Sequence, residues 1–119
     1  MTGEPLQWSV WMVDLDPVVG SEQAGRRPVV IVSREPANAA LPVVTAVPLT
    51  SRKRGRRIYP NEALIPRGEA GLSRESVAMA HQVRTVSKRR LAKRLGHLEE
   101  SAVQRAIRDA LKIQLDLDE

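Results

Sequence analysis

Residues 14–28 read DLDPVVGSEQAGRRP, a polar, glycine-containing segment that stands between two apolar ones. Residues 10–15 lead into it with alternating side chains, and the apolar, β-branched run 29–32 follows it. Alternation and β-branched runs are typical of strands, whereas a proline and two glycines in the segment break both helix and strand. A connection of this length, well above the ~2–5 residues of ordinary hairpins, is uncommon unless it has a function. The stretch therefore predicts two neighbouring strands joined by a binding loop.

The predicted loop carries groups that suit a binding site. It offers a hydroxyl, a carboxylate and an amide at Ser21, Glu22 and Gln23, and its glycines let backbone N–H groups approach a ligand. Arg27 stands at the junction of loop and strand, where Pro28 restricts its backbone toward extended conformations. An arginine anchored there can present its planar guanidinium to a phosphate, or it can form an ion pair with Glu22 at the rim of the loop.

Composition predicts one basic domain over residues 1–119, with a frayed start at residues 1–6. There is no cysteine, which excludes thiol catalysis and cysteine-based zinc sites and is compatible with the cytoplasm. We expect no signal peptide and no membrane span, because neither pattern occurs in the sequence. A net charge of +5 favours a polyanionic partner, although a charge that serves solubility alone is the alternative. The aromatic residues Trp8, Trp11 and Tyr59 are too few for a base-stacking platform.

Turn residues divide the rest of the chain into short strands and a helical end. Pro48 is expected to mark the end of a strand, a bulge or an edge, and Ser87 to begin a short basic helix that stops at Gly96. Apolar residues then recur with helical spacing, which predicts an amphipathic helix over 99–115. Short strands separated by turns every ~8–12 residues suggest a small barrel, here five-stranded and closed or flanked by the C-terminal helix. The expected strands are residues 7–15, 28–33, 42–49, 58–65 and 75–86, with turns at 35–41 and 66–71 and a basic loop at 50–57.

Four further positions are candidates for function. Thr50 directly follows a strand expected to run near the one after the loop, so its hydroxyl could donate to a phosphate oxygen, or it could be an ordinary strand end. Gln82 and Arg84 share one face of the last expected strand, which is either a binding face or a solvated one. His81 falls on the opposite face between apolar neighbours, which predicts a structural role at a core or subunit surface rather than general-base catalysis.

Metal and cofactor binding are poorly supported by the sequence. His81 and His97 lie apart, in no ligand pattern. Turn chemistry explains Asp14 and Asp16 better than a carboxylate-only magnesium site does. No glycine-rich phosphate loop of the nucleotide-binding kinds occurs. We therefore expect no metal and no cofactor.

Three segments of the chain, in this order, resemble the MazF/PemK family of toxin endoribonucleases. The first segment is long and specific, and the second is weak alone. Three matches in the same order are not expected by chance. With the C-terminal helix, the resemblance covers roughly residues 8–115. The segments are Asp14-Leu15-Asp16-Pro17 with Gly20-Ser21-Glu22-Gln23, Gly25 and Arg27-Pro28; then Val47-Pro48-Leu49-Thr50-Ser51; then Gln82-Val83-Arg84-Thr85-Val86 with Lys88 and Leu91.

The resemblance implies a mainly β fold with a C-terminal α-helix, a small SH3-like barrel of about five to seven strands that CcdB-like proteins share. It implies a homodimer with active sites near the subunit interface. It also implies metal-independent, sequence-specific cleavage of single-stranded RNA, whether messenger, ribosomal or transfer RNA. The implied partners are this RNA and a cognate antitoxin protein that blocks the site, in the cytoplasm and without a membrane.

Site residues follow from the same resemblance. The family's catalytic arginine falls on Arg27 and its catalytic threonine on Thr50. The chain departs from the family at His81, where an acidic residue is common, at Arg34-Glu35, and in the arginine-rich loop 52–57. The expected RNA-binding residues are Ser21, Glu22, Gln23, Ser51, Arg52, Arg54, Gln82 and Arg84.

The chemistry of RNA fits this set of residues. RNA carries its own nucleophile, the 2′-hydroxyl, so the protein has to position a phosphate and stabilise developing charge. Arg27 suits charge stabilisation better than proton transfer, because a guanidinium stays protonated near neutral pH. One alternative is a non-enzymatic, CcdB-like inhibitor of a protein target such as DNA gyrase, against which an intact Arg27 and Thr50 argue. Another is a basic nucleic-acid-binding regulator that uses loop 52–57.

Overall fold

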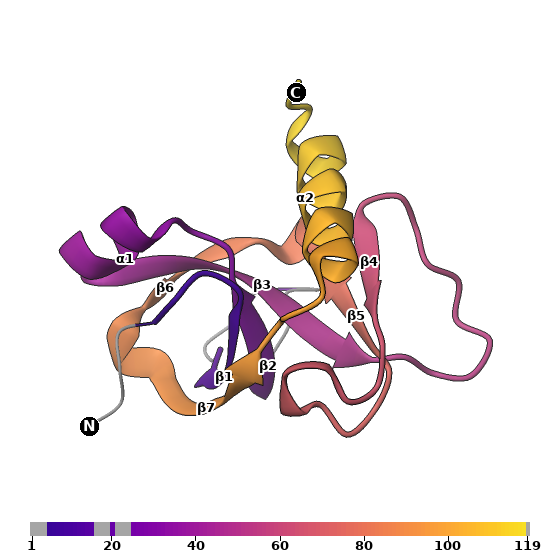
Figure 1. Ribbon diagram of the computed structural model, residues 1–119, viewed down its shortest axis with the longest axis horizontal. Helices are drawn as coiled ribbons and strands as arrows, with labels where there is room; N and C mark the ends of the chain where they lie inside the picture. Colours follow the sequence, from indigo (N-terminus) through magenta and orange to yellow (C-terminus); the bar gives the residue numbers. More distant parts are fainter. Residues whose placement is uncertain (1–4, 16–19, 21–24, 119) are drawn as a thin grey trace.

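The computed structural model describes residues 5–15, 20 and 25–118, which form an antiparallel β-sheet with a long helix at the C-terminal end (Figure 1). The strands are β1 (Ser9–Asp14), β2 (Arg26–Ile31), β3 (Val43–Ser51), β4 (Glu62–Ile65), β5 (Ser76–Met79), β6 (Arg84–Ser87) and β7 (Leu91–His97). The helices are α1 (Glu35–Ala40) and α2 (Ser101–Leu115), with 3₁₀ turns η1 (Glu69–Gly71), η2 (Ala80–Gln82) and η3 (Lys88–Arg90). The path of paired strands runs β4-β5-β3-β2-β1-β7, and β6 pairs with β3 beside it.

The central strand, β3, joins two parts of the sheet because its two ends pair with different strands. Residues 43–46 pair with β6, and residues 49–51 pair with β5. Between them the strand pairs with β2, where Pro48 faces Val29. The prediction that Pro48 ends the strand is wrong: the proline is buried inside β3, at the point where the strand changes its partner and a missing N–H donor can be tolerated.

Apolar side chains fill both faces of the sheet. α2 packs its apolar stripe against β4 and η2, and Val103, Ile107 and Ala110 are buried there at the spacing that the sequence predicted. Full burial of one such side chain, as at Ile107, contributes roughly 1.5–3 kcal/mol. A second cluster, which includes Trp11 and Ile31, lies on the opposite face, because successive side chains of a strand alternate between faces.

The segment before β1 is tied to the sheet. The N–H of Trp8 donates to the carbonyl of Ile31 at 2.7 Å, and the carbonyl of Leu6 accepts from the N–H of Ser9 at 3.0 Å. Pro5 is buried as well. Of the start expected to be frayed, residues 1–4 lie outside the described residues, whereas residues 5 and 6 are held in place.

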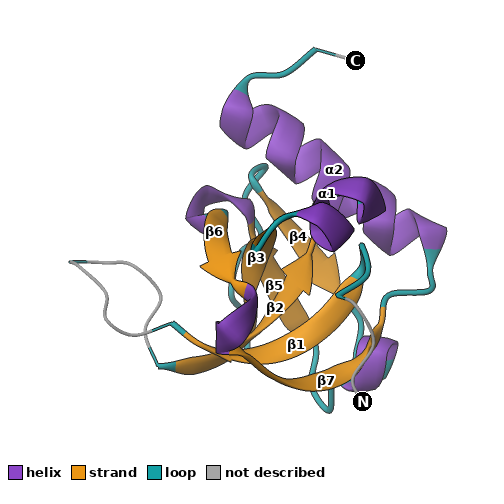
Figure 2. Cartoon of the chain, turned by 90° about the vertical axis from the view of Figure 1, so that its left-hand side faces the viewer, coloured by secondary structure: helices purple, strands orange, loops and turns teal. Residues whose placement is uncertain are grey.

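The mainly antiparallel fold with a C-terminal helix is confirmed, and so are β1, β2, β3 and α2 to within a few residues. The sheet has seven strands, within the five to seven that the resemblance implies and two more than the turns alone suggested. Among the described residues, the path of strands ends at β4 and β7 without a pairing that joins the two (Figure 2).

Three of the predicted elements between β2 and β6 are wrong. Residues 35–41, expected as a turn, contain α1, because a proline is tolerated in the first turn of a helix and the side-chain amide of Asn38 donates to the carbonyl of Ser33. The strand expected over 58–65 begins only at Glu62. The strand expected over 75–86 is two strands, β5 and β6, with η2 between them.

The short basic helix expected after Ser87 is also wrong. The Ser87 hydroxyl accepts the backbone N–H of Arg89 at 3.3 Å, as an N-cap would, but only the single turn η3 follows. Residues 91–97 then pair with β1 as β7. Pairing with a strand that is distant in the sequence therefore outweighs a local helix signal.

Candidate active site

The ends of β2 and β3 bring Arg27 and Thr50 to one pocket. Arg27 lies on β2 opposite Val13 of β1, and Thr50 lies on β3 opposite Val77 of β5. Because β2 and β3 pair with each other, both side chains line the same pocket, whose volume is about 390 Å³. The structure thus joins the guanidinium and the hydroxyl that the sequence singled out, while their catalytic roles stay predictions. The pocket is lined by Met12, Arg26, Arg27, Pro28, Leu49, Thr50, Ser51, Gly71, Leu72, Ser73, Arg74, Ser76 and Leu95.

The pocket combines an apolar floor with a polar rim. Among the lining residues, Leu49 is fully buried and Leu72 is 8% exposed, and we call these buried apolar residues the floor of the pocket. Arg26 and Arg74 are exposed at the rim, next to the half-buried Arg27. Charges beside a low-dielectric wall interact more strongly than charges in open water. The arrangement therefore suits an anion, and a phosphate in particular.

Sequence reasoning missed the contribution of the segment between η1 and β5. This segment supplies Ser73 and Arg74 to the pocket, and Ser76, the first residue of β5, also lines it and donates its hydroxyl to the carbonyl of Arg74 at 3.1 Å. Residues 72–74 lie between the turn expected at 66–71 and the strand expected at 75–86, and the sequence assigned them no role. Its place beside Thr50 depends on the pairing of β3 with β5, and no local pattern reveals that pairing.

Two glycines bring this segment against β7. A Cβ on Gly71 would lie 2.5 Å from the carbonyl oxygen of Leu95, and the residue has a φ of +73°. A Cβ on Gly96 would lie 2.6 Å from the backbone carbon of Ala70. Only a residue without a side chain permits these approaches. They place Leu72 and Leu95 together in the wall of the pocket.

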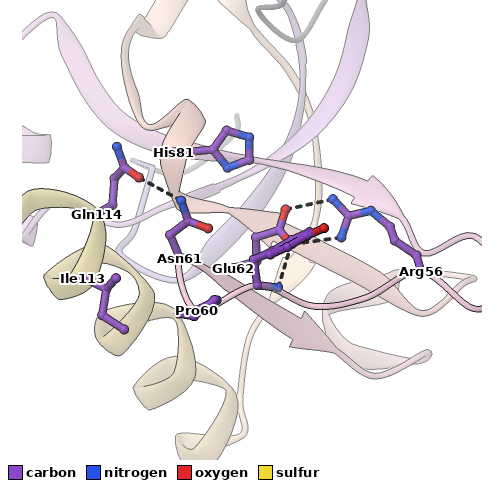
Figure 3. A pocket seen from close by; sticks show the side chains of 8 residues that line it. Arg56, Pro60, Asn61, Glu62, His81, Ile113 and Gln114 are labelled. Atoms are coloured by element: carbon purple, nitrogen blue, oxygen red, sulfur yellow. Dashed lines mark hydrogen bonds and ion pairs between the residues drawn. The ribbon is translucent and has the colours of Figure 1, made fainter.

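The basic loop after Thr50 is held by contacts within the protein. Arg52 donates from Nε and Nη2 to the carbonyl of Arg56 at 3.0 and 2.9 Å, and its Nη1 lies 3.2 Å from Oε1 of Glu75. Arg56 donates to both carboxylate oxygens of Glu62, at 3.0 and 2.8 Å (Figure 3). Two arginines of the loop thus have structural partners. Lys53, Arg54 and Arg57 are exposed, and Ser51 lies at the pocket, where the sequence expected an RNA contact.

Glu62 is a buried carboxylate with a complete set of partners. Its side chain is 3% exposed, and besides Arg56 it accepts the backbone N–H of Tyr59 at 3.1 Å. The hydrogen bond from Arg56 lowers the pKa of Glu62 below its usual value, against the opposing effect of burial. The same bond raises the pKa of Arg56. Both groups are therefore charged at neutral pH, and the pair fixes the loop to the start of β4.

Gln82, Arg84 and His81 lie apart from this pocket. Gln82 ends η2 and Arg84 lies on β6 opposite Ala46, and neither is among the described residues that line it. Of the two surfaces expected for His81, the core is wrong: His81 is exposed, because η2 interrupts the strand whose alternation was used, while a place at a subunit surface stays a prediction. His81 instead borders a second pocket of about 750 Å³ with Asn61 and the C-terminal half of α2 (Figure 3).

Three other expectations concern the loop between β1 and β2, metal binding and a membrane span. Ser21, Glu22, Gln23 and Asp16 lie outside the described residues. Among the residues that the structure describes, no three His, Asp or Glu side chains lie close enough together to hold a metal ion. Within the same residues, no helix is long and apolar enough to cross a membrane.

Comparison with known proteins gives a family match over most of the chain. A family model of PemK-like, MazF-like toxins of type II toxin–antitoxin systems matches residues 6–115. Endoribonuclease MazF9 of Mycobacterium tuberculosis (strain ATCC 25618 / H37Rv) is 36% identical over 113 residues, which cover 91% of this chain and 93% of the relative. Endoribonuclease EndoA of Bacillus subtilis (strain 168) is 33% identical over 108 residues, which cover 91% of each. A solved mycobacterial endoribonuclease in complex with its cognate antitoxin superposes with a TM-score of 0.79 at 27% identity, covering 97% of this chain and 98% of that one.

Proposed function

The chain belongs to the PemK-like, MazF-like toxins of type II toxin–antitoxin systems, and we propose that it is an endoribonuclease that cleaves single-stranded RNA. The observation that carries this proposal is the pocket in which Arg27 and Thr50 meet over an apolar floor. The two curated relatives, both named as endoribonucleases and both aligned over about nine-tenths of the chain, support it.

In the proposed reaction, the RNA supplies the nucleophile. The 2′-oxygen attacks the adjacent phosphorus and gives up its proton, and the bond from phosphorus to the 5′-oxygen breaks as that oxygen takes a proton. The products are a 2′,3′-cyclic phosphate and a 5′-hydroxyl. Because nucleophile and phosphate belong to the same strand, the protein contributes geometry and charge rather than a nucleophilic side chain.

Each polar group of the pocket has a role in this reaction. Arg27 donates to the non-bridging phosphate oxygens, where negative charge increases in the transition state. The Thr50 hydroxyl donates to the same phosphate. Arg26 and Arg74, at the rim, hold neighbouring phosphates of the strand in position. This mechanism requires no metal ion, because the guanidinium groups supply the positive charge.

We propose a homodimer as the form that acts. Large apolar side chains are exposed around the second pocket and the end of α2, with Tyr59 and Leu115 at 50% and Ile113 and Leu117 at 56%. Exposed apolar groups that gather in one region are typical of a surface that another chain covers. Ile113→Asp should therefore shift the protein from dimer to monomer in sedimentation velocity, whereas the same change at the exposed Leu41 should not.

We also propose a cognate antitoxin as the protein partner and the cytoplasm as the place of action. The mycobacterial relative of similar fold was solved with its cognate antitoxin, which supports such a partner for this chain. An antitoxin that covers the pocket would block RNA and stop cleavage. Co-expression with a candidate antitoxin should relieve the growth arrest that the toxin causes and should yield a stable complex of the two proteins on purification.

The test of the function incubates the purified chain with mixed cellular RNA in the presence of EDTA and sequences the cut ends. The proposal predicts cuts at one short sequence, with 2′,3′-cyclic phosphate or its opened form on one side and 5′-hydroxyl on the other. Arg27→Ala is the matched inactive control. RNA that is bound and left intact would indicate the nucleic-acid-binding regulator, and inhibition of DNA gyrase without RNA cleavage would indicate the CcdB-like inhibitor.

A further inference from the structure

We infer that the basic edge of the sheet, defined as Lys88, Arg89, Arg90, Lys93 and Arg94 on η3 and β7, is a track that binds the RNA backbone beyond the cleaved bond. The inference rests on the proposed ribonuclease function and names the path of its substrate. It starts from the distribution of charge, which the net value of +5 does not reveal.

Positive charge is concentrated in this part of the chain, and the next acidic residues, Glu99 and Glu100, come only after β7. Residues 84–98 contain six Lys or Arg and no Asp or Glu. Arg89, Lys93 and Arg94 are exposed. The arginine-rich loop after Thr50 also has three exposed cations, Lys53, Arg54 and Arg57. The guanidinium carbon of Arg57, however, lies 5.1 Å from the centre of the Tyr59 ring, and none of the three cations lies on a strand that pairs with β1 at the pocket wall. The basic edge is therefore the stronger candidate for contact with a polyanion.

The register of the sheet connects this edge with the catalytic pocket. Met12 of β1 faces Pro28 on one side and Lys93 on the other. Directly opposed residues of antiparallel strands carry their side chains on the same face. Met12 and Pro28 both line the pocket. Lys93, opposite Met12 on β7, therefore lies on the same face of the sheet, one strand beyond the pocket. Two strand spacings separate Pro28 from Lys93, which is about 10 Å.

Two further contacts hold the edge next to the pocket. Leu95 of β7 lines the pocket directly, and its carbonyl lies against Gly71. On η3, the guanidinium of Arg90 donates from Nη1 to the backbone carbonyl of Asp14 at 3.0 Å, at the base of the loop between β1 and β2. Among the described residues, Asp14 is the one acidic group that the register places at this end of β1. The edge is thus a continuation of the pocket and not a separate patch.

Single-stranded RNA is the partner that this arrangement fits. A substrate whose scissile phosphate lies at Arg27 carries further phosphates on both sides, and a row of Lys and Arg beside an apolar wall attracts them whatever the base sequence. The edge should therefore control affinity for long RNA and its dependence on salt. It should leave the rate of the bound complex and the choice of cut site unchanged.

The test compares two variants that each lose three positive charges. The edge variant is Arg89→Gln, Lys93→Gln and Arg94→Gln, and the matched control is Arg34→Gln, Arg105→Gln and Arg108→Gln, three exposed residues that lie outside η3 and β7. Binding is measured by fluorescence anisotropy at several salt concentrations. The probe is a long RNA that carries a 2′-deoxy nucleotide at the cut site, and a short oligonucleotide that spans only the cut site is measured beside it.

For long RNA, the edge variant should lower the slope of log affinity against log salt by about 2, since each lost phosphate contact removes ~0.7 on a single strand. The control should keep the wild-type slope, and the short oligonucleotide should bind all three proteins alike. Lys93→Gln alone should lower the slope by ~0.7, which keeps the test valid if the triple variant folds poorly.

An unchanged slope, or an equal change in the control, would overturn the inference. So would an edge variant that binds RNA normally but loses affinity for an acidic polypeptide such as polyglutamate, because the edge would then be a protein-docking surface. The binding measurement needs no cleavage, so it separates the two proposals. Wild-type protein that binds the RNA through the edge yet never cuts its ribose form would defeat the proposed function alone.

Discussion

Replacing Glu62 with Gln should destabilise the fold by about 2–3 kcal/mol, because it removes the charge from a buried ion pair. The Glu62 side chain is 3% exposed and accepts three hydrogen bonds, two from Arg56 and one from the N–H of Tyr59. Breaking a fully buried pair costs ~3–5 kcal/mol. Arg56 is 28% exposed and regains some hydration, so we expect a smaller loss of unfolding free energy here. The amide of a glutamine can still accept one bond, while its NH₂ group faces the guanidinium.

Urea unfolding at fixed protein concentration measures this cost, with Glu75→Gln as the matched control. Glu75 is 46% exposed and pairs with Arg52 through one contact of 3.2 Å, so its replacement should cost below about 1 kcal/mol. Acid should remove the difference between wild type and Glu62→Gln. The pKa of Glu62 is lowered in the folded state, so its stabilisation is complete above the ordinary value of 4.5 and is lost as the pH falls through the lowered pKa.

Two results would refute this reasoning. One is a Glu62→Gln protein no less stable than Glu75→Gln at neutral pH, which would show that the pair contributes no more than an exposed one. The other is a difference between wild type and Glu62→Gln that persists unchanged down to about pH 3. In either case the loop would be held by something other than this carboxylate.

Three further changes test the pocket. Thr50→Val should lower the single-turnover cleavage rate by about tenfold, the value of one neutral hydrogen bond, and a wild-type rate would remove Thr50 from the mechanism. Arg74→Ala should raise KM and lower the salt slope by ~0.7 with little change in kcat, and a selective loss of kcat would instead place Arg74 at the reacting phosphate. Gly71→Ala should cost roughly 1–3 kcal/mol in urea unfolding, more than the change at Gly68, which also has a positive φ but open space around it; equal costs would show that contact with Leu95 is unimportant.

Much of the fold follows from local patterns. The alternation of residues 10–15, the β-branched run after Pro28 and the helical spacing in α2 each predicted the element that the structure shows. The misses share a physical cause. β7 carries a helix-like start at Ser87, yet its residues pair with β1, some eighty positions earlier in the chain. No local pattern contains that pairing, and it outweighs a weak preference for a helix.

The residues of the site were predictable where a local pattern marks them, and not where they depend on the pairing of distant strands. Arg27 and Thr50 stand at visible junctions between strand and loop, and the resemblance to a known family added their roles. The contribution of Ser73 and Arg74 depends on β3 pairing with β5 and on a glycine packed against β7, which only the folded chain reveals. The core alternative for His81 failed because the single 3₁₀ turn at residues 80–82 interrupts the strand, so the side chains there do not alternate between faces.

The measurement that tests the central claim most directly is the single-turnover cleavage of one defined RNA, in EDTA, by wild type and by Arg27→Ala. Wild type should cut without added metal and leave a 2′,3′-cyclic phosphate and a 5′-hydroxyl. Arg27→Ala should be slower by about 10²–10³ or more, the usual effect of one lost donor to a charged transition state, while circular dichroism shows an intact fold. Cleavage by Arg27→Ala at the wild-type rate, or wild-type activity that vanishes in EDTA and returns with magnesium, would contradict the account.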